Sequence, residues 1–456
     1  HRMWHMGLWS TMPDGMAARS VFGNFTKGPY SVFEARSIPG SRKIIFTASA
    51  HHSHAGGSLV LLDPQKGVDG QAPMTRLTPE VPFPEYEGWS DSYYANPFPL
   101  SEEHYLVTWS PVKLSRHAFA KDGSPVPGPI NSLGVYLFDA FGNLELLYRD
   151  ASISSMCPLP IRPRVRPAAV ASEVPRHADR EEGFMLLQDV YRGDLDGFER
   201  GTIRRLRIVG IPPKTDPRVN HPVLGVTRDD PGKFVLGTVP VEKDGSAYFR
   251  VPSGLPFFLQ ALDAEGMAVQ TMRSATYVQP GQTYSCIGCH EHRGTAAPNQ
   301  PALATLREPS RIRPGPEGSW PLDFNVLVQP VLDAHCVMCH WSGDPVPKSD
   351  LTSGKAYQSL VTFGGEHSLR QHVLARYDGR RSIAGACAAS SSLVLQLLKD
   401  GHFEIKLDAV EWERLITWMD TYSQTTGSFS PQQEQRLREF RKRVAPLLAE
   451  SEGRSQ

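Results

Sequence analysis

Two short runs of the sequence carry residues whose types and spacing indicate one particular chemistry. Both have the form C-x-x-C-H, and their cysteines and histidines are Cys286, Cys289, His290, Cys336, Cys339 and His340. Each run is typical of a covalent c-type haem site, because two thiols three positions apart reach the two vinyl groups of one porphyrin. The adjacent imidazole then lies under the iron as its axial ligand. The sequence therefore predicts two covalently attached c-type haems, with His290 on haem iron 1 and His340 on haem iron 2.

Paired C-x-x-C units have other uses, so three alternatives remain open beside haem. They are a zinc site, a redox dithiol and a chance match. The two pairs are well separated in the sequence, and each carries its own His directly after the second Cys, which a shared tetrahedral site does not require. Two such runs among only six cysteines favour haem. Whether zinc or calcium is also bound is left open by the sequence.

The composition fits a chain of several domains with many turns. At 456 residues, the usual domain size gives about three domains. The 48 basic and 48 acidic residues balance, which argues against a surface for nucleic acid or an anionic membrane. No apolar run approaches the ~20 residues that a membrane helix needs. We therefore expect no nucleic acid, no transmembrane segment, and partners that are proteins or small molecules.

The expected cofactor also predicts a location. Because c-type haems are attached after export, we expect the protein in the periplasm or another exported bacterial compartment. The residues begin at His1 without an apolar leader, so we expect a signal peptide outside the given residues. In an oxidising compartment, the remaining Cys157 and Cys387 either form a disulfide or stay as free thiols.

Residues 1–157 have the pattern of short strands separated by turns. The candidate strands are 32–38, 43–48, 58–63, 94–100, 104–109, 134–139 and 144–148. They fall into two groups, each of about the size of one propeller blade. A propeller needs at least about four blades. The pattern thus predicts the C-terminal part of a β-propeller, and a small β-sandwich complete in itself is the alternative.

The rest of the chain divides by composition and periodicity, and the predicted fold class is mainly β with a C-terminal α domain. The predicted parts are a Pro-rich linker at 158–175, a middle β-sandwich-like domain at 176–285, a first haem-binding segment at 286–320, a cytochrome c domain with the second haem at 321–430, and a C-terminal helical tail at 431–456. No helical pattern precedes Cys286. We therefore expect the first haem on a loop at a domain junction, where it keeps an open face.

The second motif has the surroundings of a small helical cytochrome c domain. A helical pattern covers 323–334, although Pro330 must interrupt or restart it. An amphipathic pattern over 407–422 predicts a closing helix.

The loop before the closing helix normally supplies the sixth iron ligand in such a domain. His402 lies there and is the predicted distal ligand of haem iron 2. His367 and His372 are the competing candidates, and an open or Met-ligated site is the remaining one. Met419 lies on the predicted closing helix, where a Met is more often part of the core.

Several motifs in a fixed order point to a family. They are Ile38-Pro39-Gly40-Ser41 with His51-His52, Asp189-Val190-Tyr191-Arg192-Gly193, Asp244-Gly245-Ser246, and Ser285-Cys286-Ile287-Gly288-Cys289-His290-Glu291, followed by the second haem domain. With these motifs, the chain resembles the alpha subunit of hydrazine synthase and its relatives over nearly its whole length. The resemblance implies a propeller, a middle β domain and a C-terminal cytochrome domain. It also implies a catalytic first haem and a second haem, with two His ligands, that relays electrons.

One position departs from the family pattern. The family places a Tyr four residues beyond the first motif's His, where it ligates the catalytic iron while that His binds zinc. This chain has Gly294 at that position. We therefore expect His290 to be the ordinary proximal ligand, and the resemblance carries the fold rather than hydrazine synthesis.

The resemblance places a histidine-rich loop near the first haem. His51 and His52 lie in this loop and could fill the distal side or donate a proton. As structure alone, they are polar residues of a Gly-rich turn. His292 and Tyr191 are the other predicted catalytic candidates, and Arg293 is a further candidate for the pocket lining.

Two function classes fit these residues. One is a haem-dependent oxidoreductase that binds a small-molecule substrate at the first haem and passes electrons through the second to a redox partner protein or to other subunits of a complex. The other is an electron-transfer or scaffold cytochrome with two six-coordinate irons. The spin state of the first haem discriminates them, because a high-spin, ligand-binding iron favours the enzyme.

Overall fold

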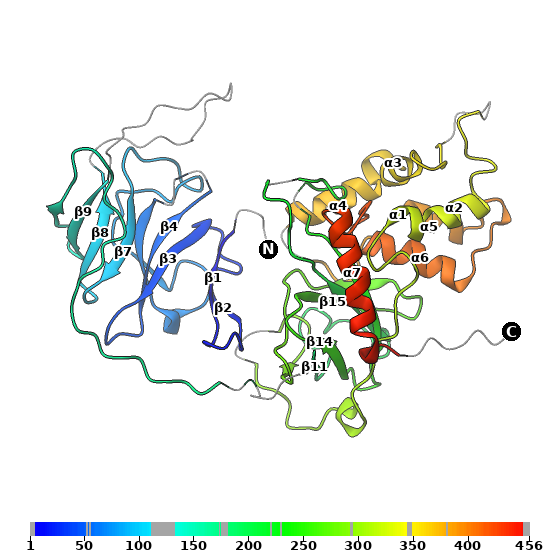
Figure 1. Cartoon of the computed structure of the whole chain (residues 1–456), viewed down its shortest axis with the longest axis horizontal. Helices are drawn as coiled ribbons and strands as arrows, with labels where there is room; N and C mark the ends of the chain where they lie inside the picture. Colours follow the sequence, from blue (N-terminus) through cyan, green and yellow to red (C-terminus); the bar gives the residue numbers. More distant parts are fainter. Residues whose placement is uncertain are drawn as a thin grey trace. The chain divides into compact units, whose positions relative to one another are not determined.

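The chain folds into two compact units, His1–Ala171 and Ser172–Gln456 (Figure 1). The computed structural model describes residues 5–51, 53, 56–110, 133–172, 174, 181–218, 221–228, 230–291, 295–343, 349–379 and 382–449. The architecture is mainly β with a C-terminal helical region, as the sequence predicted. Within the described ranges, no helix combines the length and the apolar character needed to cross a membrane.

The first unit contains two four-stranded antiparallel sheets and a short β-ribbon. Each four-stranded sheet joins strands that follow one another in the sequence, in the orders β3-β4-β5-β6 and β10-β9-β8-β7. The strands are β1 (Leu8–Ser10), β2 (Arg19–Phe22), β3 (Ser31–Ser37), β4 (Ile44–Ser49), β5 (Ser58–Leu62), β6 (Met74–Arg76), β7 (Tyr94–Pro99), β8 (His104–Trp109), β9 (Gly134–Asp139) and β10 (Leu144–Tyr148), with a 3₁₀ turn η1 (Pro64–Lys66). Side chains of both sheets share one core, which includes Ile45, Leu59, Tyr105 and Phe138. The two sheets have the form of propeller blades, and the propeller itself stays a prediction.

The second unit begins with two sheets that pack on one hydrophobic core, as expected for a sandwich-like domain. The sheet orders are β14-β11-β17 and β13-β12-β15-β16. The strands are β11 (Glu182–Leu187), β12 (Arg205–Gly210), β13 (Phe234–Pro240), β14 (Ala247–Pro252), β15 (Phe257–Leu262), β16 (Ala268–Thr271) and β17 (Thr283–Cys286). Met185 and Phe249 of the first sheet meet Ile208, Leu236 and Phe257 of the second in this core.

The helical region follows and has a core of its own. Its elements are η2 (Leu303–Leu306), α1 (Phe324–Leu327), α2 (Gln329–His335), α3 (Ala356–Thr362), η3 (Gly365–His367), α4 (Leu369–Asp378), α5 (Leu393–Lys399), η4 (His402–Glu404), α6 (Ala409–Asp420), α7 (Pro431–Arg443) and η5 (Ala445–Leu447). The predicted interruption at Pro330 is present, because α1 ends at Leu327 and a new helix begins at Gln329 with the proline in its first turn. Leu332, Leu415 and Trp418 are among the buried side chains that join α2 to α6.

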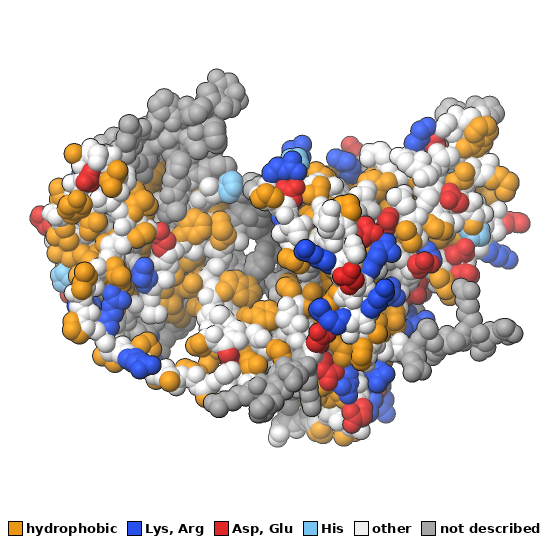
Figure 2. Space-filling model, in the orientation of Figure 1, with side chains coloured by type: hydrophobic (Ala, Val, Ile, Leu, Met, Phe, Trp, Pro, Cys, Tyr) orange, Lys and Arg blue, Asp and Glu red, His pale blue; other side chains and the backbone are white. Residues whose placement is uncertain are grey.

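The last helix returns to the sandwich. Leu437 of α7 belongs to the sandwich core, and its backbone carbonyl accepts a 3.1 Å hydrogen bond from Nε1 of Trp320. Phe440 packs its ring against Trp320 and Phe234. The outer face of this part of the unit carries charged side chains of both signs (Figure 2). Along the sequence, the residues of the helical core thus lie between two segments that belong to the sandwich core.

Several elements differ from the sequence prediction, and the short strands β1, β2, β6 and β16 were not predicted. A loop was expected before Cys286, but β17 leads to it and pairs in parallel with β11. This strand has only four residues, and its partner lies about a hundred residues earlier, so no local pattern reports it. Helices α3 and α4 were also not predicted. The division between the units falls within the predicted linker at 158–175, and the other domain boundaries stay predictions.

Candidate functional site

The second C-x-x-C-H motif begins where α2 ends. Cys336 is the C-terminal cap of this helix, and its backbone N–H donates to the Leu332 carbonyl. The chain then turns so that Nδ1 of His340 donates a 3.1 Å hydrogen bond to the backbone carbonyl of Ser349. A carbonyl only accepts, so Nδ1 carries the proton and Nε2 is left as the metal-binding nitrogen. Helix α2 and this bond thus set the position and the tautomer of His340.

His340 faces a largely apolar cavity of about 160 Å³. The residues lining it are Val331, Leu332, Cys336, His340, Ser349, Leu351, Ser359, Leu360, Phe363, Val394, Leu397, Leu398, His402, Ile405, Leu407, Leu415 and Met419. Burial, and then the neighbouring Cys339, raise the pKa of the Cys336 thiol to about 11. The structure therefore brings a motif cysteine, the motif histidine and His402 to one apolar cavity.

The two histidine rings lie at a separation that suits a metal ion between them. The ring centroids of His340 and His402 are 6.1 Å apart, and the ring planes differ by 40°. An iron bound by two imidazole nitrogens at about 2 Å each holds the centroids roughly 6 Å apart. The donor set and the apolar lining together fit a haem with two axial His ligands.

His402 lies on a backbone with three residues in the left-handed region. Gly401 has a φ of 93°, and Phe403 and Glu404 have φ values of 47° and 58°. This conformation is unfavourable for a bulky residue such as Phe403, and strain of this kind concentrates at functional sites. The Phe403 ring meets the imidazole of His402 edge-on, at 4.8 Å between centroids. The loop therefore holds His402 in a fixed direction at a conformational cost.

Of the competing ligand candidates, only Met419 lines the 160 Å³ cavity. His367 ends the 3₁₀ turn η3 and is not a lining residue of the 160 Å³ cavity. His372 of α4 lines a different cavity, of about 20 Å³, together with Cys387. Met419 does line the larger cavity, from α6, and is fully buried. The geometry favours His402 over the other histidines, and the ligand assignment itself stays a prediction.

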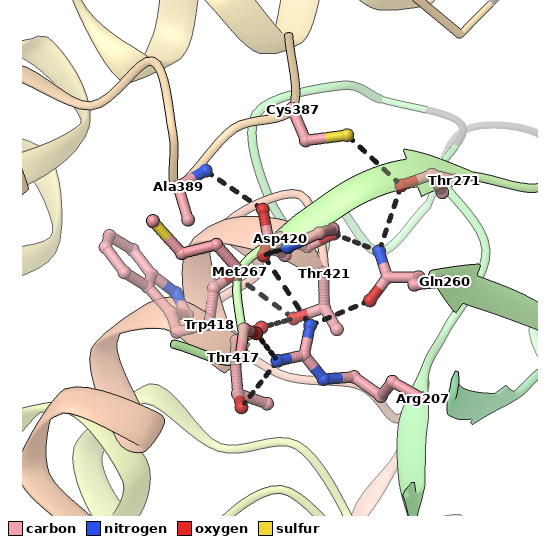
Figure 3. A network of polar contacts seen from close by, with 12 residues as sticks. Arg207, Gln260, Met267, Thr271, Cys387, Ala389, Thr417, Trp418, Asp420 and Thr421 are labelled. Atoms are coloured by element: carbon pink, nitrogen blue, oxygen red, sulfur yellow. Dashed lines mark hydrogen bonds and ion pairs between the residues drawn. The ribbon is translucent and has the colours of Figure 1, made fainter. Parts of the chain in front are cut away.

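A buried polar network fixes the end of α6 against the sandwich (Figure 3). Asp420 accepts backbone N–H groups from Ala268 at 2.8 Å and from Ala389 at 2.9 Å. Its carboxylate lies 3.6 Å from the guanidinium of Arg207, which also donates to Gln260 at 2.9 Å. Burial raises the pKa of the Asp420 carboxyl and lowers that of the Arg207 guanidinium. The network holds the helix that supplies Met419 to the cavity.

The first motif is held by backbone contacts with the loop that follows β11. The Gln188 amide donates to the Cys286 carbonyl at 2.9 Å, and the Cys289 amide donates to the Arg192 carbonyl at 2.9 Å. Gly193 has a φ of 93°, and a Cβ there would collide with the Cys289 carbonyl. A glycine is thus required for this close approach.

The cysteines of the first motif pack against the sandwich core. Burial, and then the carboxylate of Glu291, raise the pKa of the Cys286 thiol to about 12. Burial, and then Cys286, raise the pKa of the Cys289 thiol to about 12 as well. His290 is at a φ of 65°, and its Nδ1 lies 3.5 Å from Oδ2 of Asp194. This motif therefore also presents two neighbouring thiols and an oriented imidazole.

The two motifs occupy separate places in the structure. The first contacts the sandwich core and the second contacts the helical core. Across the part of the chain that the structure describes, no three or more His, Cys, Asp or Glu side chains gather in a group that could hold a metal ion. The four motif cysteines therefore do not form one shared site. Cys157 and Cys387 are both free thiols.

The predicted catalytic residues fall into three cases. His51 is exposed on a turn of the first unit, and its expected place near the first haem stays a prediction. His52 and His292 lie outside the described residues, as do Gly294 and Arg293.

Tyr191 is buried in the sandwich core. Its hydroxyl oxygen accepts the backbone N–H groups of Gly201 at 2.7 Å and of Ile203 at 2.8 Å. These bonds give Tyr191 a part in holding its loop, and its catalytic role stays a prediction.

Sequence reasoning missed two residues that contact the motif histidines at Nδ1, Asp194 and Ser349. Ser349 acts through its backbone, so its residue type carries no signal. Asp194 directly follows the run Asp189-Val190-Tyr191-Arg192-Gly193, which was noticed in the sequence without a structural role. The position of Asp194 next to this run was the one signal in the sequence that could have pointed to it.

Comparisons with known proteins agree on one family. The model of the hydrazine synthase alpha subunit middle domain matches residues 201–291. Hydrazine synthase subunit alpha from Kuenenia stuttgartiensis is 24% identical over 435 residues, covering 73% of this chain and 50% of that protein. The solved structure of Kuenenia stuttgartiensis hydrazine synthase matches 93% of this chain and 66% of its own, with a TM-score of 0.64 at 19% identity. The chain thus spans about half the length of the curated relative that it matches. The chain is similar to the hydrazine synthase alpha subunit in sequence and in fold, and the resemblance predicted from its motifs is confirmed.

Proposed function

We propose that the chain carries two covalently attached c-type haems and acts as a haem-dependent oxidoreductase. The observation that supports this most directly is the pair of imidazoles in the second site. The ring centroids of His340 and His402 are 6.1 Å apart at an apolar cavity that Cys336 also lines. A bis-imidazole haem is low-spin and has no open position, so this site suits electron relay rather than substrate binding.

The first site has the features of a catalytic centre in this proposal. Cys286 and Cys289 supply the two thioether links, and His290 is the proximal ligand. When bound, the haem supplies one-electron chemistry and an open coordination position. Cys286 ends β17, and this motif contacts the sandwich core, whereas Cys336 of the second motif contacts the helical core. A small-molecule substrate binds there, and His51, His52, His292 and Tyr191 are the proposed residues for proton transfer.

The proposal does not extend to hydrazine synthesis. Gly294 stands where the family's catalytic tyrosine is expected, and the relative is 24% identical with half of its length matched. What the relationship supports is a subunit that works with other subunits or with a redox partner protein. Covalent haem attachment further implies an exported compartment such as the periplasm.

The experiment that tests the proposal counts covalent haems. Denaturing electrophoresis with haem staining, together with the intact mass, should show two haem increments per chain. The paired change Cys286→Ala, Cys289→Ala should remove one of them and leave the spectrum of the second haem intact. The matched change Cys336→Ala, Cys339→Ala should do the reverse. An intact mass without haem increments would overturn the proposal.

A non-catalytic electron-transfer or scaffold cytochrome is the second candidate, because the oriented imidazole of His290 also suits a six-coordinate iron. The two functions predict different spectra for the first haem. An enzyme should show a high-spin signal that shifts when cyanide or imidazole is added. A relay or scaffold should show a low-spin signal in both haems that does not respond to these ligands.

A further inference from the structure

The two motif histidines have different partners at Nδ1. His340 donates to the backbone carbonyl of Ser349 at 3.1 Å, which is a neutral acceptor. Nδ1 of His290 lies 3.5 Å from a carboxylate oxygen of Asp194. The same motif thus occurs twice in one chain with a neutral partner in one case and a charged one in the other. This contrast is independent of the comparison with relatives.

Asp194 is held in place by two backbone contacts of its turn and by one contact to its carboxylate. Its own backbone N–H donates to the Cys289 carbonyl at 2.9 Å, which ties it to the motif. The Gly193 carbonyl accepts from Asp196 at 3.1 Å and closes the turn around it. The side-chain amide of Gln270 donates to Oδ2 of Asp194 at 3.2 Å. The oxygen that faces His290 is therefore the one that Gln270 fixes.

Gln270 is itself immobilised in the sandwich. It lies on β16, is 6% exposed, and its side-chain oxygen accepts the Thr271 amide at 2.9 Å. Thr271 in turn accepts from Gln260 at 3.3 Å, within the network around Asp420 (Figure 3). The position of Asp194 is thus determined by the rigid sheet and not only by its own loop.

We propose that Asp194 is a positioning residue for His290, one that fixes the plane of this imidazole and makes it a stronger donor to the first haem than His340 is to the second. The inference rests on the proposed function. A carboxylate beside the outer nitrogen of a ligating His raises the basicity of the ring. Its negative charge also favours the oxidised iron over the reduced iron, because the oxidised centre carries one more positive charge. Asp194 therefore lowers the reduction potential of the first haem, whereas Ser349 has no net charge to do so.

The experiment measures both haem potentials in the holoprotein by a spectroscopic redox titration. Asp194→Asn keeps the size of the side chain and removes the charge. It should shift the potential of the first haem to a more positive value and leave that of the second unchanged. In the reduced protein, the iron–imidazole stretch of the first haem should move to lower frequency in the resonance Raman spectrum. Asp194→Glu should restore part of both shifts.

A matched control separates this local effect from a general loss of charge. Glu199→Gln removes an exposed carboxylate from the same loop and should leave both potentials unchanged. If Asp194→Asn does not accumulate as folded protein, Gln270→Met removes the donor that fixes the carboxylate and should shift the first potential in the same positive direction.

The outcomes are distinguishable. A first-haem potential and stretch that are unchanged in Asp194→Asn, or in Gln270→Met where the former does not fold, would overturn the inference. So would a shift of equal size in Glu199→Gln. Absence of covalent haem in the unmodified chain would instead overturn the proposed function, and haem staining detects that case before any potential is measured.

Discussion

Replacing Asp420 with alanine should destabilise the second unit strongly, because the carboxylate is fully buried and has several partners. The change leaves the buried guanidinium of Arg207 without its charged partner, and breaking such a pair costs about 3–5 kcal/mol. The amides of Ala268 and Ala389 also lose their acceptor, at about 1–3 kcal/mol each. These costs are not additive, because a shift of the helix end or the entry of water reduces several of them at once. We expect a loss of about 4 kcal/mol, which lowers the ratio of folded to unfolded chains roughly a thousandfold.

Urea unfolding of the full chain measures this loss. Among the described residues, the α-helices all lie in the second unit, so far-UV circular dichroism reports the unfolding of the unit concerned. Glu366→Ala is a suitable control, because this carboxylate is exposed and its loss should change the free energy of unfolding by less than about 0.5 kcal/mol. Residues of α6 line the 160 Å³ cavity. Under the proposed function, the Asp420→Ala protein should therefore lose the low-spin absorption of the second haem at a lower urea concentration than the unmodified protein.

A double change tests the electrostatic part of the reasoning. Replacing Arg207 with methionine and Asp420 with leucine removes both charges together, and such replacements of buried pairs are often neutral or stabilising. This protein should therefore regain much of the stability that Asp420→Ala loses. The reasoning is refuted if Asp420→Ala costs less than about 1 kcal/mol, or if its effect equals that of the exposed control.

Three further predictions concern the two sites and the stability of the fold. His402→Ala should convert the second haem from a low-spin to a high-spin or water-ligated spectrum, and His402→Met should raise its reduction potential; a low-spin bis-imidazole signal that persists in the alanine variant would contradict the assignment. Gly193→Ala should lower covalent haem content at the first motif in a haem-stained gel, because the new Cβ meets the Cys289 carbonyl and φ is 93°; full haem content would contradict this. Burial, and then Arg376, hold the pKa of His372 below 6.5, so the stability linked to this group is present above pH 6.5 and is lost as the pH falls through the lowered pKa. His372→Gln should flatten that loss in urea midpoints measured across this range, and an unchanged slope would exclude the linkage.

Local patterns in the sequence predicted most of the strands. Strands such as β8 and β9 were found with the observed bounds, because alternating apolar residues and turn residues define them without reference to distant parts of the chain. His402 was predicted as a ligand because it lies in the loop directly before the closing helix, and that position can be read from the sequence alone. The structure then showed that His402 and His340 share one cavity.

The contacts that depend on distant segments could not be predicted. Asp194 lies about a hundred residues before His290, and the two meet only because β17 pairs in parallel with β11. Gln270 and Asp420 read as ordinary polar residues in the sequence, although both are buried and bonded. The helix α4 has no apolar face that would reveal it, since its apolar residues are spread around its axis. Pairing and burial of this kind follow from the tertiary fold, which a single sequence does not report.

The return of α7 to the sandwich has a consequence for the order of events during biosynthesis. The sandwich core that packs on Cys286 and Cys289 includes Leu437 and Leu447, so it is incomplete until the end of the chain has been made. At about 5–20 residues per second, synthesis of residues 291–447 takes roughly 8 to 30 s. During that time the finished core does not yet cover the two thiols. Once formed, the core buries them, which raises their pKa values and keeps them protonated. Under the proposed function, haem is attached only after export, so the chain must reach that compartment before the core closes over the two thiols, and a chain truncated before α7 would leave them uncovered for longer.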